Sequence, residues 1–103
     1  MSLDRIKAAL LTVGVPVDHY EAAQRPDKYI VWAEDGANAL HADGRLSELA
    51  WTGTVDYFTK TEDDPNVELI WQALESVCAC ALNSVQYEDG TGYIHYEWAF
   101  EVA

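Results

Sequence analysis

The first apolar stretch of the chain has the spacing of an amphipathic helix. Between Leu3 and Val13 apolar residues recur on one face, and Ser2 stands where an N-cap residue is expected. Gly14 and Pro16 follow as a stop signal, because glycine favours the position after a helix and proline cannot continue one. The pattern predicts a helix over residues 3–13.

A second helical pattern follows the acidic segment Glu62-Asp63-Asp64. We expect Asp64 to cap this helix and Pro65 to take its first position, where a missing N–H breaks no hydrogen bond. The apolar positions that follow keep the i, i+3, i+4 rule of a buried helix face: Val67, Ile70, Trp71, Leu74, Val77, Cys78 and Ala81. We therefore predict one helix that carries this whole set.

β-branched and aromatic residues mark the strands of the first half. A short strand is predicted at Val15–Glu21 and a well-buried one at Lys28–Glu34. From Leu46 to Lys60 apolar and polar residues alternate, which is the pattern of a long strand with one buried face.

Two turn dipeptides, Asp35-Gly36 and Asp43-Gly44, bracket a segment of small residues. Asp-Gly is a common hairpin-turn pair, so the first dipeptide is expected to end the preceding strand. The segment between them, Ala37–Ala42, has weak patterning. We interpret it as a projecting arm or loop.

The C-terminal segment has the pattern of a β-hairpin. A two-residue turn at Asp89-Gly90 would place Val85 opposite Ile94, on the face of the apolar residues of the last strand. A three-residue loop would set Val85 against His95 and break the pattern. The two-residue turn is therefore the prediction.

The predicted elements follow the order α-β-β-β-α-β-β, with the arm between the second and third strands. Runs of antiparallel strands interrupted by one helix indicate an α+β fold. We expect a single domain over residues 1–103. In it, an antiparallel sheet of four to five strands has two helices packed on one face.

The chain is strongly acidic. Eighteen Asp and Glu face six Lys and Arg, which gives a formal charge of −12 over 103 residues. This excess disfavours both nucleic-acid recognition and binding to an anionic membrane, because both need a basic patch. No apolar run has the length of a membrane span, and early charges interrupt a signal-peptide core. Two closely spaced cysteines, Cys78 and Cys80, favour a reduced, cytosolic chain.

The sequence offers little catalytic chemistry. His19, His41 and His95 lie in different predicted elements, without a Cys or second His at ligand spacing. His95 and Glu97 could share an exposed strand face and hold a metal or act as a base, but surface decoration explains them as well. Neither cysteine has a basic neighbour to lower its pKa. We expect no cofactor, no metal and no enzymatic activity, and a small metal-dependent enzyme is the weakest alternative.

Aromatic residues and the open side of the sheet suggest partners. Trp32, Trp51, Trp71 and Trp98 are expected in the core. A sheet with helices on one face leaves its other face and its edges free, and neighbouring subunits are the usual cover. The outward residues of the last strand suit a polar interface: Tyr93, His95, Glu97, Ala99 and Glu101.

The layout of nearly the whole chain resembles that of a known family. A short amphipathic helix precedes the strand motif Lys28–Trp32, and the arm leads into a second motif, Leu49–Lys60. After the helix that starts at Asp-Pro, the chain closes on the hairpin Leu82–Val102. This layout resembles the small tail terminator, or tail completion, proteins of long-tailed phages and prophages, which share their role with the lambda minor tail protein U.

The resemblance implies a structural role without a cofactor. Protomers would form a ring, typically a hexamer, that caps the tail tube and meets the head-tail connector. Partners would be further copies of the chain, the tube protein and the connector, in a virion assembled in the bacterial cytoplasm. The sheet edge and the arm, Ala37–Arg45, would supply contacts between subunits. The candidate interface residues are Leu40, His41, Asp43, Arg45, Tyr93, His95 and Glu97.

The charge admits two further interpretations. Acids that line the channel of a ring would repel passing DNA and would not hold it. Alternatively, the chain could be an acidic inhibitor that mimics nucleic acid and occupies a basic host or phage protein. A mimic would be expected to array its acids in rows on one surface. Here they are dispersed among strand faces, turns and helix starts, which favours plain solubility.

Overall fold

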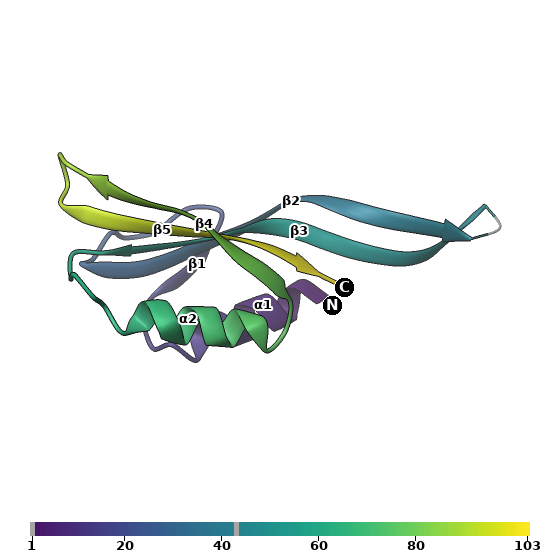
Figure 1. The fold of residues 1–103 in the computed structure, drawn as a ribbon, viewed down its shortest axis with the longest axis horizontal. Helices are drawn as coiled ribbons and strands as arrows, with labels where there is room; N and C mark the ends of the chain where they lie inside the picture. Colours follow the sequence, from purple (N-terminus) through teal and green to yellow (C-terminus); the bar gives the residue numbers. More distant parts are fainter. Residues whose placement is uncertain (1, 43) are drawn as a thin grey trace.

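The computed structural model describes residues 2–42 and 44–103, and side chains everywhere in these ranges except at 40–42 and 45–48. The element order confirms the predicted α+β fold (Figure 1). The elements are α1 (Ser2–Leu11), β1 (Val17–His19), β2 (Lys28–Ala42), β3 (Arg45–Thr59), α2 (Asn66–Glu75), β4 (Ala79–Glu88) and β5 (Tyr93–Val102).

The strands form one five-stranded sheet in the order β1-β2-β3-β5-β4, and both helices cover the same face (Figure 1). The expectation of a purely antiparallel sheet is wrong at one edge, because β1 runs parallel to β2. β1 is shorter than predicted and stops before Tyr20, which has a φ of +73°. The loop of residues 20–27 then carries the chain back to the start of β2, so both strands run in the same direction.

The largest departure from the sequence prediction lies in the second strand. Asp35-Gly36 does not end β2. Glu34 pairs with Gly53 and Gly36 with Thr52, which leaves Asp35 as an extra residue in a β-bulge. Pairing then continues to the end of β2, opposite the start of β3.

Beyond the bulge the β2–β3 hairpin projects from the body as a two-stranded ribbon, which we call the arm (residues 36–42 and 44–50; Figure 1). The projecting arm is thus confirmed, although it is a paired hairpin with a second register shift between Leu40 and His41, and not a loop. It gives the molecule a long dimension of 52 Å against 25 and 23 Å in the other two directions. Small residues hide the alternation that would identify strands here.

α2 is shorter than its apolar pattern predicted. The helix begins at Asn66, directly after Pro65, and ends at Glu75. Val77 and Cys78 pack half-buried against the core from the turn that follows, and Ala81 belongs to β4. The prediction of one longer helix is wrong because this turn faces the core on the same side as the helix does.

The register of the β4–β5 hairpin differs from the predicted one by two residues. Glu88 pairs with Tyr93 and Val85 with Tyr96, so the loop has four residues, and Val85 is exposed. Gly92 closes this loop with a φ of +79° and donates its N–H to the Glu88 carbonyl at 2.8 Å. A two-residue shift keeps every side chain on its face, so the apolar pattern could not distinguish the two registers.

The core lies between the helices and the covered face of the sheet. Trp32 and Trp98 are buried as expected, whereas Trp51 and Trp71 are half-buried at its margin. The core residues are Leu3, Ile6, Leu10, Ile30, Trp32, Val55, Tyr57, Ile70, Leu74, Trp98, Phe100 and Val102.

Candidate functional site

The candidate interface residues divide into two groups at opposite ends of the long axis. Leu40, His41 and Arg45 lie in the strands of the arm, although their side chains are not described, and Asp43 lies outside the described residues. Tyr93, His95 and Glu97 lie in the first half of β5, at the end of the sheet farthest from the arm (Figure 1). One subunit therefore cannot bring the two groups into one site.

Tyr93 is buried and not outward-facing, which corrects its placement on an exposed strand face. It is 7% exposed, and its hydroxyl lies 2.6 Å from the Pro26 carbonyl, to which it can donate. Its ring meets Tyr29 edge-on, with 5.6 Å between ring centres, and Lys60 Nζ lies 4.9 Å from its centre. Tyr93 thus fixes the loop of residues 20–27 against the sheet.

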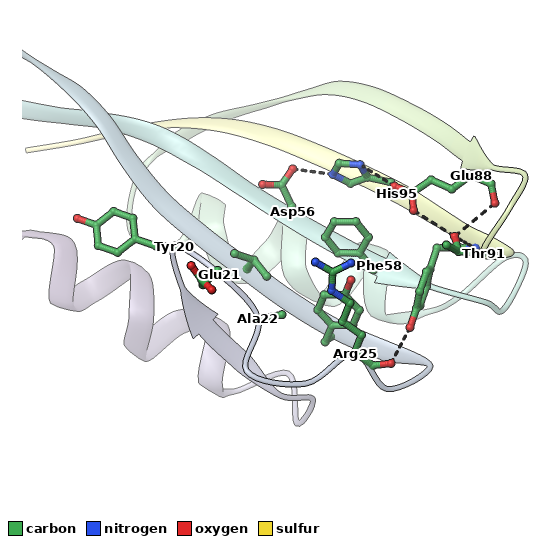
Figure 2. Close-up of a pocket in the computed structure, with 12 residues that line it drawn as sticks. Tyr20, Glu21, Ala22, Arg25, Asp56, Phe58, Glu88, Thr91 and His95 are labelled. Atoms are coloured by element: carbon green, nitrogen blue, oxygen red, sulfur yellow. Dashed lines mark hydrogen bonds and ion pairs between the residues drawn. The ribbon is translucent and has the colours of Figure 1, made fainter.

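This loop creates a hollow on the sheet face that carries no helix, which we call the open face. The hollow has a volume of about 390 Å³ (Figure 2). Its floor is aromatic: Tyr29 stacks on Phe58 at 4.7 Å, and Phe58 stacks on His95 at 4.3 Å. Arg25 points into it from the loop (Figure 2). This hollow could not be predicted from the sequence, because it depends on a loop that folds back over strands distant in the chain.

His95 is an ion-pair partner inside the hollow. Its Nε2 lies 2.6 Å from Asp56 Oδ1, and its Nδ1 lies 3.7 Å from Glu88 Oε2. The hydrogen bond to Asp56 raises the pKa of His95 above its usual value; burial opposes this, and Glu88 and Glu97 add to it. Glu97, the partner predicted from sequence, lies opposite Asp56 in the ladder. The sequence could not reveal the Asp56 contact because it requires the β3–β5 register.

His19 also pairs with an acid, and both cysteine thiols have raised pKa values. His19 Nε2 lies 2.6 Å from Glu34 Oε1. Burial raises the pKa of the Cys78 thiol to about 11, and burial with Glu75 raises that of Cys80, so both are thiols at neutral pH. Within the described residues, no group of three or more His, Cys, Asp or Glu side chains is placed to hold a metal ion.

A second hollow of about 460 Å³ lies on the open face near the base of the arm. Its lining combines small side chains with Asp35 and Glu101. Thr52 donates a hydrogen bond to Asp35 Oδ1 at 3.0 Å, and Asn38 of the arm donates one to Glu101 Oε1 at 3.0 Å. The open face thus carries acids along its length, with polar contacts that hold the arm's base.

None of the helices within residues 2–42 and 44–103 is long and apolar enough to cross a bilayer. No protein-family model matches the chain, and no curated protein matches its sequence.

Solved structures do share the fold. One is a chain of the cryo-EM structure of an extracellular contractile injection system, the PVC sheath/tube terminator in its extended state. The TM-score is 0.50 at 8% sequence identity, and the match covers 98% of this chain and 54% of that chain. The chain therefore spans about half the length of this neighbour. At this identity, the likeness shows that the two share a fold.

Proposed function

We propose that the protein is a tail terminator of a phage or prophage, a structural subunit and not an enzyme. Copies form a ring, typically a hexamer, that caps the tail tube, stops its growth and meets the head-tail connector. The observation that carries this proposal is the likeness of fold, over 98% of this chain, to a sheath/tube terminator. The sequence layout supports the same role independently.

The shape of the subunit supports assembly into a ring. The arm projects from one end, whereas the β4–β5 hairpin forms the opposite end (Figure 1). Two different surfaces on one chain make heterologous, head-to-tail contacts, and such contacts give a ring when the rotation closes. A long subunit with unlike ends is therefore suited to ring formation.

The acidic open face supports a role beside passing DNA. Asp35, Asp56, Glu97 and Glu101 share this face, and Arg25 lines its first hollow. If the face lines the channel, its charge repels the phosphate backbone and lets DNA slide. A ring reconstruction that places these four acids on the outer rim would remove this part of the proposal.

The proposal is tested by light scattering and negative-stain microscopy at low and high protein concentration. Both are repeated in the presence of a phage tail tube protein. We expect rings in solution or at tube ends, and shorter, capped tubes when the protein is present during tube growth. A protein that forms no ring and leaves tube length unchanged would overturn the proposal. A strict monomer that binds a basic nuclease in a salt-sensitive manner would instead indicate a nucleic-acid mimic.

A further inference from the structure

β4 is an edge strand with little of the usual protection apart from one bulge, between Leu82 and Ser84. It pairs with β5 on one side, and no described strand lies on its other side. Its ten residues contain no Lys or Pro, and Glu88 at its end is the single charged residue. Its helix side exposes two apolar residues, Val85 at 52% and Tyr87 at 66%. An edge of this length and composition is a template for pairing with another chain.

The arm is a strand donor of suitable length. Ala37, Asn38 and Ala39 are exposed. β5 flanks only the base of the ribbon, where it pairs with Trp51 and Thr52, and no described strand pairs with the ribbon farther out. About seven residues per strand give a reach of roughly 20 Å at about 3.3 Å per residue. The molecule measures 25 and 23 Å across its shorter directions. One arm can therefore extend across most of a neighbouring body.

Charge favours the arm over other surfaces as the partner of β4. Residues 36–50 contain one base, Arg45, and two acids, Asp43 and Glu48, in a chain of charge −12. An arm that approaches β4 thus meets less repulsion than a second acidic body would. The arm's sequence also contains three leucines, which give it apolar side chains to offer a partner: Leu40, Leu46 and Leu49.

We propose that the arm of one subunit adds a strand to the β4 edge of the next copy, and that this contact builds the ring. The inference rests on the proposed terminator function and names its subunit contact. Backbone hydrogen bonds along β4 supply the pairing, as in other cases of β-strand addition. A two-fold β4–β4 contact fits less well, because it would close a dimer and leave both arms unpaired.

The first test uses two complementary variants. The edge variant carries Val85→Lys and Tyr87→Lys. In the arm variant Asn-Gly replaces Ala39–Leu49, so that the pair Asn38 and Ala50 flanks a two-residue turn. Each variant alone should be a folded monomer by circular dichroism and light scattering. Their mixture should form a heterodimer of about twice the 11.5 kDa subunit mass, because one intact arm meets one intact edge.

The control is Leu11→Lys, which makes the same kind of substitution once, at an apolar residue of α1 that is 55% exposed. It should assemble as the wild type does. The inference is overturned if the edge variant alone still forms rings, or if the mixture stays monomeric at concentrations where the wild type forms rings. An edge variant that forms rings but no longer caps tubes would assign β4 to the tube protein.

The second test is disulfide cross-linking in a background of Cys78→Ser and Cys80→Ser. Ala39→Cys on the arm is combined in turn with Ala79→Cys, Ala81→Cys and Gln86→Cys, all exposed along β4. On a non-reducing denaturing gel, at least one pair should give a ladder of cross-linked oligomers up to the ring. Each single variant should run there as a monomer. Dimers from Gln86→Cys alone would indicate β4–β4 pairing and refute the inference. If the wild type forms rings but no cysteine pair gives a ladder, the arm–β4 contact is refuted and the terminator proposal stands. If the protein forms no ring on any tube, the terminator proposal itself is contradicted.

Discussion

Asp64 is a buried carboxylate at the junction of β3, β2 and α2, and its loss should strongly destabilise the fold. It is 4% exposed. Its Oδ2 accepts hydrogen bonds from the hydroxyls of Tyr57 and Thr59, each at 2.7 Å, and lies 3.3 Å from Lys28 Nζ. Its Oδ1 accepts the N–H of Asn66 at 2.9 Å at the start of α2. One carboxylate therefore joins two strands to a helix.

The cost of Asp64→Ala follows from the groups that it leaves unpaired. Tyr57 and Thr59 are fully buried, and their O–H groups lose their acceptor, although each oxygen still accepts a hydrogen bond from Asn66 Nδ2 or the Thr61 N–H. Each buried donor without an acceptor costs about 1–3 kcal/mol. Loss of the hydrogen bond at the helix start adds about 1 kcal/mol. We expect Asp64→Ala to lower the free energy of unfolding by about 3–7 kcal/mol, a large part of the roughly 5–15 kcal/mol typical of a domain. Tyr57→Phe removes one hydrogen bond to a charged group and should cost about 1.5–3 kcal/mol.

Urea denaturation followed by circular dichroism measures these losses. The matched control is Asp27→Ala, because the Asp27 side chain is 82% exposed and lies 3.7 Å from Lys60 Nζ. Exposed pairs contribute at most about 1 kcal/mol. If Asp64→Ala lost no more stability than Asp27→Ala, the assigned role of the buried network would be refuted.

The same network predicts a dependence on pH. Burial raises the pKa of Asp64, but hydrogen bonds from Thr59, Tyr57, Asn66 and Lys28 outweigh it, so the pKa lies below its ordinary value. A lowered folded-state pKa contributes stability above the unfolded-state pKa and loses it as pH falls through the folded value. The stability gap between wild type and Asp64→Ala should therefore shrink below about pH 4. A gap that widened in acid would contradict this assignment.

Three further experiments test other parts of the structure. Gly53→Ala should cost about 1–3 kcal/mol of stability, because a Cβ there would lie 2.2 Å from a backbone carbonyl of β2. Gly90→Ala is the control: Gly90 has open space around it, so the variant should change stability by no more than about 0.5 kcal/mol. Equal effects of the two variants in thermal melts would be inconsistent with this. The hydrogen bond to Asp56 raises the pKa of His95. The stability that wild type gains over His95→Gln should therefore be present at low pH and lost as pH rises through that pKa. An NMR titration in which the His95 ring titrates at or below its ordinary pKa would argue against this. Burial raises the pKa of Cys78 to about 11, so iodoacetamide should modify it slowly near neutral pH, and modification as fast as that of a free thiol would rule this out.

Local patterns in the sequence predicted the elements, and long-range pairing decided where those predictions failed. The alternation over Leu46–Lys60 matched β3 within a residue at each end, because one face packs on the core along the body. Asp35-Gly36 looked like a turn, but pairing with β3 continues past it and makes Asp35 a bulge. The edge strand was predicted, but its parallel direction was not, since that direction is set by a loop and not by the strand's own three residues.

The candidate site was predictable in outline but not in its contacts. The arm was found because Asp-Gly dipeptides bracket small residues, and this signal does not depend on tertiary structure. Tyr93 was misplaced because strand alternation assigns a face and cannot show that a loop covers it. The pairing of His95 with Asp56 joins residues 39 apart in the chain and needs the register of β3 on β5.

The arm and the β4 edge each lack a strand on one side, and this connects the fold to the proposed assembly. A two-stranded ribbon without a packed face is only marginally stable in water, because few apolar contacts offset the entropy of ordering it. The alanines and Gly36 that make the arm slender also deprive it of such contacts. A third strand on the ribbon, or a sixth strand on the sheet, would supply hydrogen bonds and apolar cover to both at once. The proposed pairing between subunits would therefore stabilise the arm and the β4 edge in a single contact, and it would leave the acidic open face available to line the proposed channel.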